Sequence, residues 1–216
     1  MKVEAVIFDL DGTIIEYKID VASGKRDLRR VIAKTGLNMD PTKVPIFELL
    51  EKAKEMLGDG FEGFKKEVYR VLDKYEVKAA REANFVRGAR ETLRWLRKRE
   101  IKLALVTNNC LNAIKILNER LGIEEFFDLL LTRDDIEEMK PSPKGIKLAM
   151  EAMGVKNAIM VGDSPVDILA SKRAGIISVG IPAVERLKER LILSGPDFLI
   201  GEIQLIKDVI ELLDRE

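Results

Sequence analysis

Apolar and polar positions change their spacing twice along the chain. Residues 3–8 form a short, mostly apolar run with β-branched side chains, which predicts a buried strand. From about residue 15 to 86 the apolar positions recur every three or four residues, which predicts amphipathic helices and no strand. Three such stretches are marked by Leu28, Val31 and Ile32, then by Ile46, Leu49, Leu50 and Ala53, then by Phe61, Phe64, Val68, Val71 and Leu72.

From residue 87 onward, helix and strand patterns alternate. The expected strands are 101–106, 129–131, 158–161, 176–179 and 198–200, and the expected helices are 89–99, 110–121, 143–153, one ending at 174, and one with the stripe Ile206, Val209, Ile210 and Leu213. Such alternation predicts an α/β fold, a doubly wound parallel sheet with helices on both faces. Residues 1–14 and 87–216 would form this core, and residues 15–86 an inserted α-helical domain.

Composition narrows the chemistry. Lysine and arginine total 37 and aspartate and glutamate also total 37, so no overall charge draws the 216-residue chain to nucleic acid or to a membrane. The chain has no histidine, which excludes mechanisms and metal sites that need imidazole. The abundance of Lys, Arg and Glu beside the single glutamine, Gln204, suggests a thermophile surface.

Cellular location can also be predicted. The single cysteine, Cys110, excludes an internal disulfide framework and fits a reducing, cytoplasmic environment. Glu4 and Asp9 interrupt the first apolar stretch, which argues against a secretory signal, and no apolar run approaches the ~18 residues of a membrane span. We expect a cytoplasmic monomer or homodimer.

The most informative segment follows the first strand. Asp9 and Asp11 are two residues apart in an extended segment, so both carboxylates emerge on one side. Carboxylates so close repel each other unless a divalent cation lies between them. Gly12, followed by Thr13, permits backbone conformations that aim N–H groups at an anion. The alternative is a surface turn, which is also rich in Asp and Gly.

Other strand ends carry polar groups too, and ligands of open parallel sheets bind at the carboxyl ends of the strands. Thr107, Asn108 and Asn109 follow one strand and could hold a phosphate oxygen or simply cap the next helix. Asp163 and Asp167 follow another and could be metal ligands or a solvated N-cap. Between these segments, Lys140 precedes a helix start and would supply a positive charge among four carboxylates.

Taken in order, the motif Asp-x-Asp-Gly-Thr at 9–13, the strand-end Thr107, the Lys140-Pro pair and Gly-Asp-x-x-x-Asp at 162–167 resemble the haloacid dehalogenase-like hydrolase superfamily, over residues 3 to about 181. The helical segment between the first two motifs resembles the cap of the phosphoglycolate phosphatase and β-phosphoglucomutase group. The resemblance implies a Rossmann-like core.

The resemblance also implies roles. Asp9 would be the nucleophile that forms an aspartyl-phosphate, and Asp11 the general acid and base. Asp9, the main-chain carbonyl of Asp11, and Asp163 would hold Mg²⁺, with Asp167 orienting the metal shell. Lys140 would balance charge as a catalytic residue and contact phosphate. The expected phosphate-binding residues are Gly12, Thr13, Thr107, Asn108 and Lys140.

We therefore expect a Mg²⁺-dependent phosphatase acting on a small organic phosphomonoester. A sugar phosphomutase with the same nucleophile stays open, as does a catalytically silent binding protein of the same fold. A dehalogenase is disfavoured because it has no use for Asp11 or a metal. The loop carrying Asn38 and Lys43 would set substrate specificity, although a solvated loop is the alternative. At the return from the helical segment the chain has Arg87 before Gly88, whereas the family commonly has a proline before this glycine. The subfamily therefore stays open.

Overall fold

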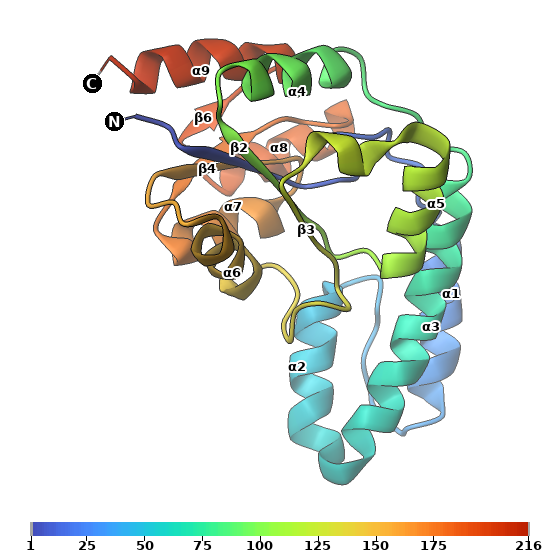
Figure 1. Cartoon of the computed structure of the whole chain (residues 1–216). Coiled ribbons are helices and arrows are strands. Elements are labelled where there is room, and N and C mark those ends of the chain that lie inside the picture. Colours follow the sequence, from blue (N-terminus) through green and yellow to red (C-terminus); the bar gives the residue numbers. More distant parts are fainter. Residues whose placement is uncertain (1, 216) are drawn as a thin grey trace.

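The computed structural model of the chain describes residues 2–215 and contains a doubly wound α/β sheet (Figure 1). Within these residues six parallel strands form one sheet in the order β3-β2-β1-β4-β5-β6. The strands are β1 (Ala5–Phe8), β2 (Lys102–Val106), β3 (Leu129–Leu131), β4 (Ala158–Gly162), β5 (Ile177–Gly180) and β6 (Phe198–Leu199). β1 is central and wholly buried because its residues face helices on both sides.

Helices cover both faces of the sheet. Side chains of α4 (Ala89–Lys98), α5 (Leu111–Leu121) and α9 (Ile206–Leu213) pack on one face, and those of α6 (Lys144–Met153) and α7 (Pro165–Ala174) pack on the other. Alternate residues of β1 enter the two cores, since Val6 and Phe8 belong to the first and Ala5 and Ile7 to the second.

Three helices between β1 and α4 lie beyond one end of the sheet (Figure 1). They are α1 (Val21–Ala33), α2 (Ile46–Leu57) and α3 (Phe61–Ala80), which is preceded by a 3₁₀ turn, Gly58–Gly60. They have an apolar cluster of their own, which includes Leu28, Leu49, Phe64 and Val68. The amphipathic stretches of the sequence are therefore real helices that bury their apolar stripes against one another.

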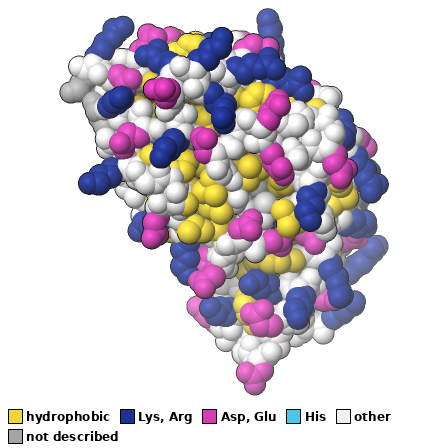
Figure 2. All heavy atoms as spheres, in the orientation of Figure 1, with side chains coloured by type: hydrophobic (Ala, Val, Ile, Leu, Met, Phe, Trp, Pro, Cys, Tyr) yellow, Lys and Arg dark blue, Asp and Glu magenta, His cyan; other side chains and the backbone are white. Residues whose placement is uncertain are grey.

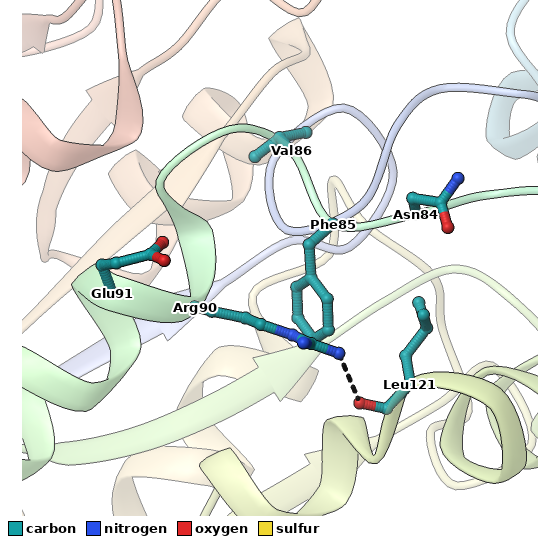
Figure 3. Close-up of a pocket in the computed structure, with 6 residues that line it drawn as sticks. All are labelled: Asn84, Phe85, Val86, Arg90, Glu91 and Leu121. Atoms are coloured by element: carbon teal, nitrogen blue, oxygen red, sulfur yellow. Dashed lines mark hydrogen bonds between the residues drawn. The ribbon is translucent and has the colours of Figure 1, made fainter.

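The chain enters and leaves this helical segment at neighbouring points. Ile15 and Phe85 form an antiparallel bridge, and the N–H of Glu16 donates to the carbonyl of Asn84 at 2.8 Å. A pocket of about 320 Å³ adjoins this point. Figure 3 shows its lining residues, among which the guanidinium of Arg90 lies over the ring of Phe85. The pocket's lining includes residues 84–86, where the chain returns from the helical segment to the sheet, and none of the acidic motif residues.

The predicted strands and helices match the observed ones to within about two residues, and the α/β fold is confirmed. One helix, α8 (Glu185–Leu193), was not predicted. Among the residues of this helix whose burial the structure describes, Leu191 alone is fully buried, while Ile192 and Leu193 are exposed. Because Ile192 and Leu193 are apolar but exposed, the sequence pattern does not mark the buried side of this helix.

The surface is heavily charged, with the two signs intermixed. Figure 2 shows acidic and basic side chains scattered over the face it displays. Within residues 2–215 the structure contains no helix that is long and apolar enough to cross a membrane.

Candidate active site

The strand-end residues converge because β2, β1 and β4 are neighbours in the sheet. Asp9 follows β1, Thr107 follows β2 and Asp163 follows β4. The four acidic motif residues are all buried, although charged residues are seldom buried without partners. Their relative exposures are 9% for Asp9 and Asp11, 4% for Asp163 and 1% for Asp167.

Lys140 supplies the positive charge in this group. Its Nζ lies 2.5 Å from Oδ1 of Asp9 and 2.7 Å from Oδ1 of Asp167, and it donates to the carbonyl of Val106 at 2.8 Å. Burial alone would lower the pKa of Lys140, but the carboxylates of Asp167 and Asp9 outweigh burial and raise it. The ammonium therefore stays charged throughout the physiological range.

The two asparagines after Thr107 hold other residues of the site in place. Oδ1 of Asn108 accepts the N–H of Lys140 at 2.9 Å, and Nδ2 of Asn108 donates to the Lys140 carbonyl at 3.1 Å. Nδ2 of Asn109 donates to Oδ2 of Asp11 at 2.6 Å. The side chain of Asn108 therefore fixes the Lys140 backbone instead of pointing to a phosphate, which leaves only its main-chain N–H for the expected phosphate contact.

Asp9, Asp163 and Asp167 form the group that could hold a cation, because each offers a carboxylate oxygen within 4.8 Å of the others. The side chain of Asp11 is not a member of this group, so a metal role for Asp11 rests on its main-chain carbonyl. No described residue donates a hydrogen bond to the carboxylate of Asp163. Burial and then the charges of Asp9 and Asp167 raise the pKa of Asp163 to about 9.

The other two carboxyls are perturbed in the same direction. Burial raises the pKa of Asp9 to about 6 in spite of Lys140, and burial together with the charge of Asp9 raises the pKa of Asp11 to about 7. Four buried carboxyls share one lysine, so they are short of positive charge. A divalent cation with oxygen ligands fits that deficit, and Mg²⁺ needs no nitrogen ligand.

Two glycines make room for this arrangement. A Cβ at Gly12, whose φ is +78°, would lie 2.4 Å from Oδ2 of Asp163, and a Cβ at Gly162 would lie 2.4 Å from Cβ of Asp167. Any larger residue at either position would displace a carboxylate. Gly12 is also in a left-handed conformation that other residues adopt at a cost.

Asp167, Thr107 and Thr13 are the remaining predicted site residues, and they differ in their hydrogen bonds. Asp167 is the N3 residue of a capping box, in which its Oδ2 accepts from Oγ and N–H of Ser164. The N-cap of α7 is thus Ser164 rather than Asp163 or Asp167, and Asp167 is buried rather than solvated and also contacts Lys140. Oγ of Thr107 accepts the N–H of Asn109 at 3.2 Å, and the buried Oγ1 of Thr13 has no partner among the described residues.

Comparison with known proteins decides the family. The family model of haloacid dehalogenase-like hydrolases matches residues 6–181. The chain belongs to the haloacid dehalogenase-like hydrolase family. The family resemblance inferred from the four motifs is thereby confirmed.

Relatives within this family carry different names. Pyrophosphatase PpaX of Halalkalibacterium halodurans is 28% identical over the whole of both chains. Phosphoglycolate phosphatase of Neisseria meningitidis is 34% identical over 83% of this chain and 80% of its own. A Thermotoga maritima protein proposed to be a beta-phosphoglucomutase superposes with a TM-score of 0.64 at 27% identity, over 98% of this chain and 100% of its own.

The raised pKa values lead to a prediction about magnesium and stability. Without a cation, Asp9, Asp11 and Asp163 keep their protons in the folded chain at pH values where the unfolded chain, which releases them near pH 4, has lost them. These three carboxyls therefore stabilise the fold at low pH. Their contribution to the free energy of unfolding is lost as the pH rises towards about 9. A Mg²⁺ ion bound by these carboxylates would replace those protons. We expect saturating Mg²⁺ to raise the unfolding temperature by about 5 °C at about pH 8 and by less at about pH 5.5.

Scanning calorimetry with Mg²⁺ and with chelator at both pH values measures this difference. Asp163→Asn is the matched variant and should lose most of the increment, because it removes one charged ligand and little volume. An equal increment at both pH values, or one retained in Asp163→Asn, would mean that Mg²⁺ stabilises the chain at another site.

Proposed function

We propose that the chain is a Mg²⁺-dependent phosphatase that hydrolyses a small organic phosphomonoester through an aspartyl-phosphate on Asp9. The observation that carries the proposal is the contact between Asp9 and Lys140 inside a buried group of acidic residues at the sheet's carboxyl end. Relatives named as phosphatases support the reaction class.

Two residues assist Asp9 in different ways: Lys140 controls its charge, and Asp11 transfers protons. Lys140 keeps Asp9 ionised in a site where burial alone would protonate it, so Oδ2 of Asp9 stays available to attack phosphorus while Oδ1 is held by the ammonium. Asp11, with a pKa raised to about 7, can carry a proton at neutral pH and give it to the leaving oxygen. The same carboxylate then accepts a proton from the water that hydrolyses the aspartyl-phosphate.

Asp9, Asp163 and the main-chain carbonyl of Asp11 would hold the magnesium ion, with Asp167 beside them. When bound, Mg²⁺ offsets the repulsion between the carboxylates and the phosphate oxygens. Thr107, Thr13 and the N–H groups around Gly12 would bind the remaining phosphate oxygens. The buried, unpartnered Oγ1 of Thr13 is consistent with that assignment.

A sugar phosphomutase is the second candidate, because the Thermotoga maritima protein proposed to be a beta-phosphoglucomutase shares the fold over its whole length. It would use the same residues and return the phosphoryl group to a sugar hydroxyl instead of water. Pyrophosphate is a further substrate to assay, given the name of the Halalkalibacterium relative.

Residues 15–86 would act as a cap domain that closes over the site and sets substrate choice. A cleft of about 560 Å³ lies between α2, α3 and the loop that carries Met139 and Pro141, and its lining includes Lys54, Lys65 and Tyr69. Asn38 and Lys43, the residues first expected to set specificity, do not line it. Comparing kcat/KM across substrates for Lys43→Met and Lys65→Met would separate the two regions; uniform losses across substrates would count against both.

A substrate panel tests the proposal. Phosphomonoesters, pyrophosphate and glucose phosphates are incubated with the protein and Mg²⁺, and free phosphate is measured beside isomer formation. We expect phosphate release from a monoester that chelator abolishes. Isomer formation without phosphate would favour the mutase, activity unaffected by chelator would refute the metal assignment, and no turnover of any compound would favour a silent binding protein.

A further inference from the structure

A second buried ionic cluster lies next to the acidic site and takes no part in the proposed chemistry. Arg133, in the loop after β3, is 3% exposed, and Glu76, on α3, is 6% exposed. Their contact is bidentate: Nη1 and Nη2 of Arg133 lie 2.7 and 2.9 Å from the two carboxylate oxygens of Glu76. Nη2 also donates to Asp73 at 2.6 Å, and the guanidinium lies over the ring of Tyr69. All three partners belong to α3, whereas Arg133 lies in the loop that follows β3.

Arg133 and Glu76 hydrogen-bond to the backbone of three consecutive residues, 108–110, in the loop that follows β2. Nη1 of Arg133 donates to the carbonyl of Asn108, and the N–H of Arg133 donates to the carbonyl of Asn109 at 2.9 Å. Oε2 of Glu76 accepts the N–H of Cys110 at 2.8 Å. The backbone of residues 108–110 is therefore fixed from one side by the sheet and from the other by α3.

One side chain of this loop contacts Asp11 directly, and another is linked to Asp9 only through Lys140. Asn109 donates to Asp11, and Asn108 holds the backbone of Lys140, whose ammonium contacts Asp9. Thr107 immediately precedes the loop. A shift of α3 would therefore move Asn108 and Asn109 together, because Glu76 bonds directly to the backbone next to them.

Two other roles for the cluster fit the structure less well. Asp73, Glu76 and Cys110 could in principle bind a cation, but the guanidinium of Arg133 already supplies the positive charge there. Burial raises the pKa of the Cys110 thiol to about 12, so the sulfur stays protonated and is a poor nucleophile or metal ligand. The arrangement of bonds points to positioning rather than to a second site.

We propose that Arg133 and Glu76 are positioning residues that form a clamp between α3 and residues 108–110, giving the phosphate-binding loop its working geometry when α3 packs against it. The proposal rests on the proposed phosphatase function and adds a physical link between the cap and the catalytic carboxylates. Its purpose would be to favour phosphate binding and transfer in the conformation in which α3 lies against the loop.

Substitutions in the clamp test this role. Glu76→Gln keeps the side-chain volume and an acceptor for the N–H of Cys110 but removes the negative charge. Arg133→Lys keeps the positive charge but cannot form the bidentate contact with Glu76. We expect Glu76→Gln and Arg133→Met to weaken binding of inorganic phosphate and to lower kcat, each by about 10- to 100-fold, with Arg133→Lys intermediate. The loss should be the same for every substrate, because the loop contacts the phosphate and not the organic group.

Two control variants separate positioning from general weakening of the cap. Lys74→Met breaks an ion pair with Asp27 that lies wholly between α1 and α3. Arg120→Met removes the side chain that donates from α5 to the carbonyls of Ala80 and Ala83, a contact between α5 and the end of α3 that does not touch residues 108–110. Both controls should leave phosphate affinity and kcat within about twofold of the unsubstituted chain.

Phosphate affinity is measured by titration calorimetry with Mg²⁺ present, kcat with a generic phosphoester, and folding by thermal unfolding, all well below the lowest unfolding temperature of the set. Folded Glu76→Gln with unchanged phosphate affinity and kcat would reduce the clamp to a stabilising contact and overturn the proposal. Equal losses in Arg120→Met would also overturn it. An unsubstituted chain that binds phosphate without hydrolysing any ester would refute the phosphatase function alone, while the binding measurements would still decide on the clamp.

Discussion

Replacing Asp9 by asparagine should abolish turnover while leaving the fold intact. The neutral amide cannot attack phosphorus to form an acyl phosphate, so we expect kcat to fall by at least about 10⁴-fold, the scale on which loss of a catalytic nucleophile is measured. The amide oxygen can still accept the hydrogen bond from Lys140. One charge is also removed from a buried group of four carboxyls, so the unfolding temperature without Mg²⁺ should stay equal or rise.

The activity measurement is a single-turnover assay with the substrate found in the panel, and Asp59→Asn is the matched control. Asp59 lies in the exposed turn between α2 and α3, so the same chemical change there should alter nothing. Asp9→Ala is measured alongside, because an asparagine can revert to aspartate by hydrolysis and an alanine cannot. Turnover retained in Asp9→Ala would mean that another group is the nucleophile.

The sheet could be predicted from sequence because its signals are local. Apolar runs of four or five residues such as Lys102–Val106 and Ala158–Gly162 are flanked by turns and alternate with helical stripes. Asp9, Thr107 and Asp163 could be placed together from one topological rule, that strand ends of a parallel sheet meet at one edge. Helix α8 had no such clear signal, because two of its apolar residues, Ile192 and Leu193, are exposed.

The inner contacts of the site depend on residues far apart in the chain, and sequence spacing carries no signal for them. Arg133 and Glu76 are separated by 57 positions and look like ordinary surface charges until the fold buries them. Asn108 looked like a phosphate ligand because it follows a strand, yet its side chain is used 32 positions away on the Lys140 backbone. The first pairing depends on how α3 packs against the loop after β3, and the second on how the loops that follow β2 and β3 lie against each other.

Replacing Lys140 by methionine should impair both catalysis and stability. The substitution keeps most of the side-chain volume but leaves Asp9 and Asp167 without their buried cation. Losing one partner of a buried ion pair costs about 3–5 kcal/mol of unfolding free energy. The pKa of Asp9, which Lys140 holds down, should rise further, so the nucleophile becomes protonated at neutral pH and kcat should fall by about 10²- to 10³-fold.

The pH profile separates this electrostatic effect from simple damage to the fold. Because Asp9 must be ionised to attack, the acid limb of kcat in Lys140→Met should move to higher pH, and part of the lost activity should return as pH rises. Lys144→Met is the matched control, since Lys144 pairs with Glu137 and Glu138 at the surface and exposed pairs contribute little. A folded Lys140→Met variant whose acid limb coincides with that of the unsubstituted chain would show that Lys140 does not control the charge of Asp9, and its role would then be limited to holding the phosphate.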